Sequence, residues 1–169
     1  MKKFKFMFLL LFFSQLANAQ SFKLITGAGL PDFVHVGGAY QISPKNEIAT
    51  HLGTFFIDNK TLASTLEHRL YYRKSTKFTD LNSWFFGQRI TYYYEKSNEY
   101  NWHSLLITLS VGKNYYFTED LGWSWDAGLF YEAIHKQFRN TTGEAIEDDS
   151  PPSIPPLLPS LRIQLFWRL

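Results

Sequence analysis

The stretch that decides the fold is Ser160-Leu161-Arg162-Ile163-Gln164-Leu165-Phe166-Trp167-Arg168-Leu169, with which the sequence ends. Successive side chains of a β-strand point to opposite faces, so this alternation predicts a strand with one strongly apolar face. The residues of that face are Leu161, Ile163, Leu165, Trp167 and Leu169. We expect such a terminal strand in a closed barrel, where the last strand pairs with the first and leaves no free edge in the hydrocarbon of a membrane.

These five apolar positions resemble the C-terminal assembly signal of bacterial outer-membrane β-barrel proteins. That signal usually ends on an aromatic residue, whereas this sequence has Leu169. The resemblance implies that the barrel-assembly machinery recognises the C-terminal strand. Together with the strand pattern of the remaining chain, it extends to the small OmpA/OmpX-type barrels and to the outer-membrane β-barrel families of the Bacteroidota. It concerns architecture and implies no activity.

Residues 1–19 have the pattern of a secretory signal peptide. Lysines near the start are followed by an apolar block, Phe6–Phe13, and then by the Ala-x-Ala motif Ala17-Asn18-Ala19. The block is far shorter than the roughly 20 residues that a membrane-spanning helix needs. We therefore expect cleavage near Ala19, with residues 20–169 forming a single domain.

Composition narrows the choice of partners. The net charge of +2 includes three lysines of the expected signal peptide, and without them the charge becomes −1. This balance gives no support for a nucleic-acid partner. The sequence has no cysteine, which rules out disulfides and thiolate metal ligands.

Alternating apolar and polar residues recur along the chain and predict eight antiparallel strands. The expected strands are residues 21–28, 33–42, 47–57, 63–73, 84–94, 103–112, 121–136 and 160–169. Spanning strands have about 9 to 11 residues, so the pattern fits an all-β, eight-stranded antiparallel up-and-down transmembrane β-barrel. The longest connection, Gln137–Pro159, is acidic and rich in proline. If both termini are periplasmic, this connection lies on the cell surface, where it has room to bind an extracellular ligand.

Periodicity alone leaves two kinds of barrel open. The apolar face points outward in a membrane barrel and inward in a soluble, lipocalin-like periplasmic binder of an apolar ligand. The second face carries mostly Gly, Ala, Ser and Thr, which suit the crowded lumen of an eight-stranded barrel, so we predict a barrel in the outer membrane. Its few charges balance in sign and need partners once buried, which predicts an ion-pair network that closes the lumen. The expected members are Glu67, Arg69, Arg89, Asp126, Glu132 and Arg162.

The resulting prediction is a non-enzymatic monomer with a structural or surface-interaction role, in contact with outer-membrane lipid and lipopolysaccharide. The main alternative is an outer-membrane lipid A or phospholipid acyl hydrolase, because similar barrels that remove acyl chains use a His-x-Ser pair. The nearest match is His103-Ser104, but adjacent strand residues point to opposite faces. His35 and His51 share the expected lumenal face, but a zinc site needs a third ligand. We therefore predict no metal and no cofactor.

Overall fold

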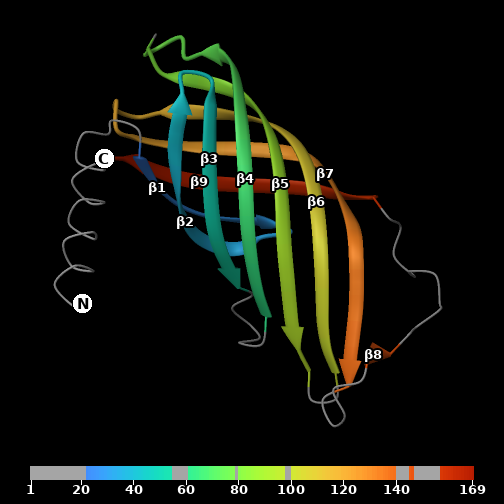
Figure 1. The fold of residues 1–169 in the computed structure, drawn as a ribbon. Helices are drawn as coiled ribbons and strands as arrows, with labels where there is room; N and C mark the ends of the chain where they lie inside the picture. The colour runs from blue at the N-terminus through green and yellow to red at the C-terminus, as the bar shows by residue number, and fades with distance from the viewer. Residues whose placement is uncertain (1–21, 55–60, 79, 98–99, 140–144, 147–156) are drawn as a thin grey trace, which may run out of the picture.

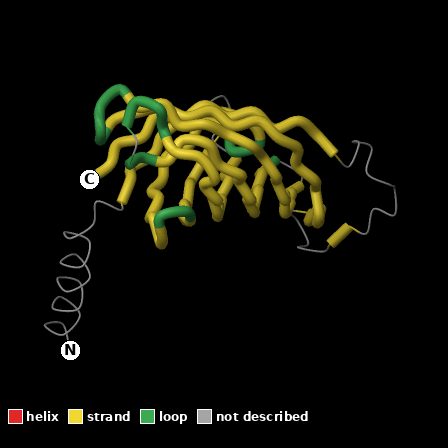
Figure 2. Tube along the Cα trace, turned by 90° about the horizontal axis from the view of Figure 1, so that it is seen from above, coloured by secondary structure: helices red, strands yellow, loops and turns green. Residues whose placement is uncertain are grey.

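A computed structural model provides the structure of the protein. It describes residues 22–54, 61–78, 80–97, 100–139, 145–146 and 157–169. Strands make up nearly all of these ranges (Figure 2). No helix in the described ranges is long and apolar enough to cross a membrane. The expected signal peptide and most of the acidic connection lie outside the described residues.

Eight long antiparallel strands form one sheet that closes on itself (Figure 1). Neighbours in sequence pair with each other, and β9 pairs with both β7 and β1, which closes the ring. A two-residue strand, β8 (Ala145–Ile146), pairs with the end of β7. The eight long strands are β1 (Phe22–Leu30), β2 (Phe33–Ser43), β3 (Asn46–Thr54), β4 (Thr61–Lys74), β5 (Asn82–Lys96), β6 (Tyr100–Tyr116), β7 (Leu121–Arg139) and β9 (Leu157–Arg168). The predicted eight-stranded up-and-down barrel is confirmed.

The C-terminal strand closes the barrel in the predicted way. Its register with β1 runs from Lys23 opposite Arg168 to Leu30 opposite Leu161. Beyond the last pair, the backbone N–H of Leu169 donates a hydrogen bond of 3.0 Å to a carbonyl at the start of β1. Pairing on both sides leaves β9 no free edge, which is the requirement for a strand inside a membrane.

The barrel is apolar outside and polar inside. On β9, Leu161, Leu165 and Trp167 are each more than half exposed, whereas Arg162 and Gln164 are buried. The same division runs through the other strands, whose exposed side chains are mainly Leu, Ile, Val and Tyr. This is the arrangement of a transmembrane barrel and the reverse of a lipocalin-like barrel, in which the apolar face would line the interior.

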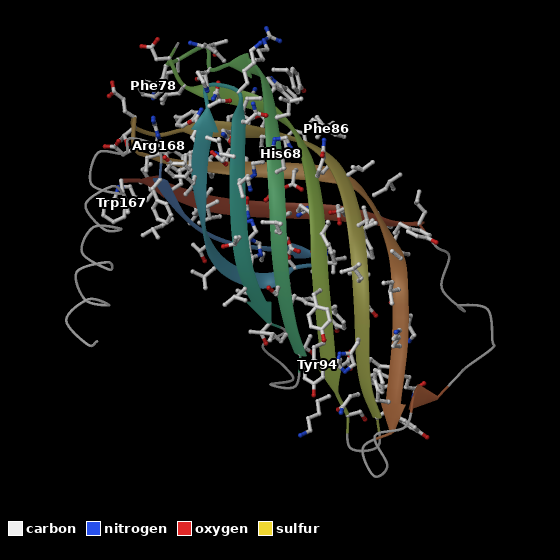
Figure 3. All side chains as sticks on the ribbon, viewed as in Figure 1. His68, Phe78, Phe86, Tyr94, Trp167 and Arg168 are labelled. Carbon is white, nitrogen blue, oxygen red and sulfur yellow. The ribbon has the colours of Figure 1, made fainter. Side chains whose placement is uncertain are left out.

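Aromatic side chains gather at both ends of the outer wall. Tyr94 and Trp167 lie toward opposite ends of the barrel (Figure 3). On β6, the two ends are marked by Lys113, which lies over the Trp84 ring, and by His103, which packs against the Tyr94 ring. The stretch between them has the length of about 9 to 11 residues that a tilted spanning strand needs. Aromatic belts of this kind sit at the two membrane surfaces.

The strands around the long connection extend further than predicted. The sequence places a loop over Gln137–Pro159, but β7 continues to Arg139 and β9 already begins at Leu157. The reason is that β6 is also long, so that Gln137 and Phe138 find hydrogen-bonding partners on it. In contrast, the β1–β2 hairpin turns early, after Leu30. The wall formed by β5, β6 and β7 is therefore taller than the wall formed by β1 and β2.

Candidate functional site

The turn between β1 and β2 places a carboxylate inside the barrel. Asp32 is 1% exposed. Its Oδ2 accepts hydrogen bonds of 3.1 Å each from Nη1 of Arg89 on β5 and Nη1 of Arg162 on β9. Its Oδ1 accepts hydrogen bonds from the hydroxyl groups of Thr65 and Thr91. The early end of the hairpin thus has a structural consequence: its tip is fixed to the lumenal side of three other strands.

Arg162 is the centre of the lumenal charges. Its three guanidinium nitrogens reach three different carboxylates: Nε lies 2.8 Å from Asp126 on β7, and Nη2 lies 2.6 Å from Glu67 on β4. The third nitrogen, Nη1, contacts Asp32. A guanidinium has donors in a fixed planar fork, so it is suited to hold several carboxylates at once. This one side chain therefore connects β9 to its neighbour β7, to β4 on the far side of the ring and to the β1–β2 turn.

A second arginine reinforces the same layer. Arg89 Nη2 lies 3.1 Å from Asp126 and donates a 2.7 Å hydrogen bond to the hydroxyl oxygen of Ser160. With its contact to Asp32, Arg89 shares two of the three carboxylates that Arg162 contacts. The two like charges are therefore separated by acids, which offsets their mutual repulsion.

The network continues toward the end of the barrel that contains the C-terminus. Nη2 of Arg69 lies 2.9 Å from Glu67, and its Nη1 lies 3.4 Å from Glu47 on β3. Glu47 also forms an ion pair with Lys23 on β1 and accepts a 3.1 Å hydrogen bond from the hydroxyl of Tyr71. The ion pairs therefore form a continuous series across the interior. It runs from Arg162 on β9 through Glu67 and Arg69 on β4 and Glu47 on β3 to Lys23 on β1.

The charges of this lumenal network cancel in the described part of the chain. Four cations pair with four carboxylates, and all eight side chains are at most 5% exposed. The members are Lys23, Asp32, Glu47, Glu67, Arg69, Arg89, Asp126 and Arg162. Charges removed from water this completely require partners, and breaking one such pair costs about 3–5 kcal/mol.

The sequence-based set overlaps with this network but differs from it. Five of its six residues are in the network, whereas Glu132 lies further along β7 and contacts His135 at 2.9 Å. A register shift opposite Leu105 and Leu106 separates that part of β7 from the charged layer. Lys23 and Glu47 were missed although they stand at lumenal positions of predicted strands. Asp32 was missed because it lies in a turn, where alternation gives no signal.

Glycines make room for the large charged groups. Gly29 lies directly opposite Arg162 on β9. A Cβ on Gly29 would fall inside van der Waals contact of the Leu161 carbonyl oxygen and of Arg162 itself. Similarly, a Cβ on Gly87 would approach the hydroxyl of Ser110. The small residues that identified the lumenal face in the sequence therefore allow a guanidinium to fit inside an eight-stranded barrel.

The two lumenal histidines are hydrogen-bonded within the interior. His51 Nε2 lies 3.0 Å from Glu67, and His35 Nε2 lies 2.9 Å from the side-chain amide of Gln164. Their rings meet edge to face, with centroids 5.2 Å apart. Within the described ranges, no three His, Asp or Glu side chains are grouped so as to hold a metal ion.

His103 and Ser104, the residues named for the hydrolase alternative, do not meet in space, because the two side chains occupy opposite faces of β6. His103 lies on the outer wall, where its ring packs against Tyr94 and Phe138 with centroids 5.0 and 5.2 Å away. Ser104 faces the interior, and its Oγ lies 3.1 Å from Nδ1 of a different histidine, His135. The register brings these two residues together directly across β6 and β7.

Ser104, His135 and Glu132 resemble a nucleophile, a base and an acid, but their contacts do not form a relay. Glu132 Oε1 lies 2.9 Å from the same Nδ1 atom of His135 that contacts Ser104. One nitrogen cannot accept a proton from the serine while donating another to the carboxylate. A working triad uses the two opposite ring nitrogens for these roles. In this geometry the three residues form a polar cluster at the mouth of the barrel.

Comparisons with known proteins give one distant likeness. No protein-family model matches the chain, and no curated protein matches it. A solved structure, the crystal structure of CarO from Acinetobacter baumannii, aligns over 88% of this chain and 97% of that chain, with 9% sequence identity and a TM-score of 0.43. Likeness at this level carries no conclusion about the function of this chain.

Proposed function

We propose that the protein is an integral outer-membrane β-barrel whose lumen is closed by ion pairs and whose role is structural or surface interaction. The observation that carries the proposal is the contrast between the two faces of the sheet. Exposed Leu, Ile and Val side chains cover the outside, while the lumenal network of four cations and four carboxylates fills the inside. In such a closed barrel the apolar outer face suits a hydrocarbon environment, and the paired charges suit an interior without an open channel.

The membrane location is tested by fractionation and by electrophoresis. We expect the protein in the carbonate-washed outer-membrane fraction, and we expect its mobility to differ between boiled and unboiled samples, because a closed barrel stays folded in cold detergent. Cleavage of the signal peptide near Ala19 is checked by mass spectrometry of the same material. Recovery in the soluble fraction after osmotic shock, with no mobility shift, contradicts the proposal.

The closed lumen makes a separate prediction about conduction. Eight strands leave an interior that side chains fill, and here Arg162 on β9 reaches across that interior to Glu67 on β4 and also holds Asp126 on the neighbouring β7. In planar bilayers we expect no steady conductance from the folded protein. We expect measurable conductance after Glu67→Ala and Arg162→Ala are combined, provided that the variant keeps its heat-dependent mobility shift. Steady conductance of the unaltered protein contradicts a plugged lumen.

The surface role is proposed for the connections at the end where β7 is tall. Strands β3, β5 and β7 all end at the same end of the barrel (Figure 1). With both termini periplasmic, that end faces the outside, in contact with lipopolysaccharide, and residues 140–156 have access to an extracellular ligand. Replacing residues 147–156 by a short Gly/Ser linker is expected to leave the mobility shift intact. It is expected to abolish binding of cells to a surface coated with the extracellular ligand.

A hydrolase acting on lipid A or phospholipid acyl chains is the second candidate, favoured by the 3.1 Å contact between Ser104 and His135. Labelling with a fluorophosphonate probe tests it, because the probe reacts only with an activated serine. Labelling that Ser104→Ala abolishes would establish this candidate. We expect no labelling, because Glu132 and Ser104 share one nitrogen of His135. An unchanged acyl pattern of lipid A in cells lacking the protein would also speak against the hydrolase.

A further inference from the structure

The lipid-facing wall is hollowed over β5, β6, β7 and β9. The hollow has a volume of about 370 Å³, and its lining is almost wholly apolar. It is lined by Phe86, Leu109, Val111, Ala127, Leu129 and Tyr131, among others. The small side chain of Ala127 stands between larger neighbours, Val111 on β6 and Leu161 on β9. An apolar hollow in the middle of this wall faces hydrocarbon, so acyl chains are the material available to fill it.

A cation stands directly beside the hollow, toward the end of the barrel that holds the C-terminus. Lys113 on β6 is in register with Trp84 on β5 and Trp125 on β7. Its Nζ lies 5.2 Å from the centroid of Trp84 and 4.5 Å from that of Tyr115. Lysine on an outer wall keeps its ammonium at the membrane surface, while Trp and Tyr mark the level of the head groups.

The register joins these two features. One outward-facing step along each strand leads from Trp84 to Phe86, from Lys113 to Val111, and from Trp125 to Ala127. The second row lines the hollow. On this strip of β5, β6 and β7, the ammonium group therefore stands at the head-group level, and the next row of side chains lines the hollow. A phospholipid has its charge and its hydrocarbon in the same order.

We propose that this strip binds one glycerophospholipid from the leaflet on the Lys113 side, with its phosphate at the Lys113 ammonium and one acyl chain in the hollow over Ala127. The inference rests on the proposed membrane location. It states that one lipid occupies a defined site, whereas the other lipids around a membrane barrel exchange. The chemistry that recognises the ligand is an anionic phosphate joined to a long alkyl chain.

The test is native mass spectrometry of the detergent-purified full chain, titrated with phosphatidylglycerol. We expect a single phospholipid adduct that persists at collision energies that strip all others. Lys113→Gln removes the cation that would bind the phosphate. Ala127→Phe fills the hollow with a side chain that is apolar and therefore suits a hydrocarbon surround. Each variant is expected to weaken retention about tenfold or more.

Two matched variants control for charge and size. Lys136→Gln removes an exposed lysine at the other end of the wall, and Ala28→Phe enlarges an exposed alanine on β1, between Val34 and Ile163. Both are expected to keep the adduct. Equal adduct distributions in all five proteins would overturn the inference, and so would a dimer whose formation Ala127→Phe abolishes, because the occupant would then be a second copy.

The same samples separate this inference from the proposed function. Each protein is first checked for its heat-dependent mobility shift. A normal shift without a retained lipid overturns the lipid site and leaves the membrane barrel standing. Absence of the shift in the unaltered protein contradicts the membrane barrel and the lipid site with it.

Discussion

Arg162 and Glu67 are 95 positions apart in the sequence, yet Nη2 of Arg162 lies 2.6 Å from Oε1 of Glu67. The contact connects the strand that closes the barrel to the strand on the far side of the ring. Both side chains are buried, and each has further partners of opposite charge. The contact therefore forms only when the ring is closed, so it links closure of the sheet to neutralisation of its interior.

Glu67→Gln tests this link. The substitution keeps the size of the side chain and removes the charge that faces Arg69 and Arg162. Removing one partner of a buried ion pair costs about 3–5 kcal/mol, because the remaining charge loses its compensation. When samples are heated to increasing temperatures before electrophoresis, we expect the folded band of the variant to disappear at a clearly lower temperature than that of the unaltered protein. Glu132→Gln is the matched control, since Glu132 is partly exposed and pairs only with His135 in the described part of the chain, and it is expected to shift the transition little.

Asp32→Asn tests the anchoring of the β1–β2 turn. Asp32 accepts hydrogen bonds from two arginines and from the hydroxyl groups of two threonines. The next residue, Phe33, has a φ of 53°, a left-handed conformation that a bulky residue keeps only when its surroundings hold it. We expect faster hydrogen–deuterium exchange in residues 29–34 of the variant and unchanged exchange in β6. Uniformly faster exchange across all strands would show that Asp32 supports the whole barrel and not the turn.

The sequence predicted the barrel because alternation is a local property. On β9, every second side chain faces outward, so Leu165 and Gln164 could be assigned to opposite faces without knowledge of any other strand. Balanced charges on the inner face likewise predicted that Arg89, Asp126 and Arg162 would meet. These inferences need only the period of the strand and the cost of burying an unpaired charge.

Other features depend on properties that alternation does not carry. The end of β7 at Arg139 is decided by backbone pairing with a long β6, not by its own side chains. Asp32 joins the network because its turn folds inward, and His135 meets Ser104 because a register shift turns the end of β7. Each of these contacts results from the relative register of distant strands. A single sequence does not specify that register.

Leu109→Arg tests the membrane exposure of the outer wall. Leu109 is 52% exposed and lies near the middle of β6, between His103 and Lys113. An arginine at the midplane of a membrane barrel costs about 2–4 kcal/mol. We expect the variant to fold poorly in phospholipid vesicles, measured as the fraction with the heat-dependent shift. Leu109→Phe, which is also large but apolar, is expected to fold like the unaltered protein. Equal folding of the two variants would mean that this wall faces water.

Gly29→Val tests whether small lumenal residues make room for the charged network. The added side chain would meet the Leu161 carbonyl oxygen and Arg162, while Ala28, the preceding residue, points to the outer wall. Overpacking an interior typically costs about 1–3 kcal/mol, and here the collision also displaces a guanidinium that holds three carboxylates. We expect Gly29→Val to lower the temperature at which the folded band is lost by more than Ala28→Val does. The two positions are adjacent on β1 and receive the same side chain, and replacing a glycine favours the strand more than replacing an alanine does, so a larger loss at Gly29 reflects the collision. An equal effect at both positions would mean that the lumen at Gly29 has space to spare, and that the glycine is not required by Arg162.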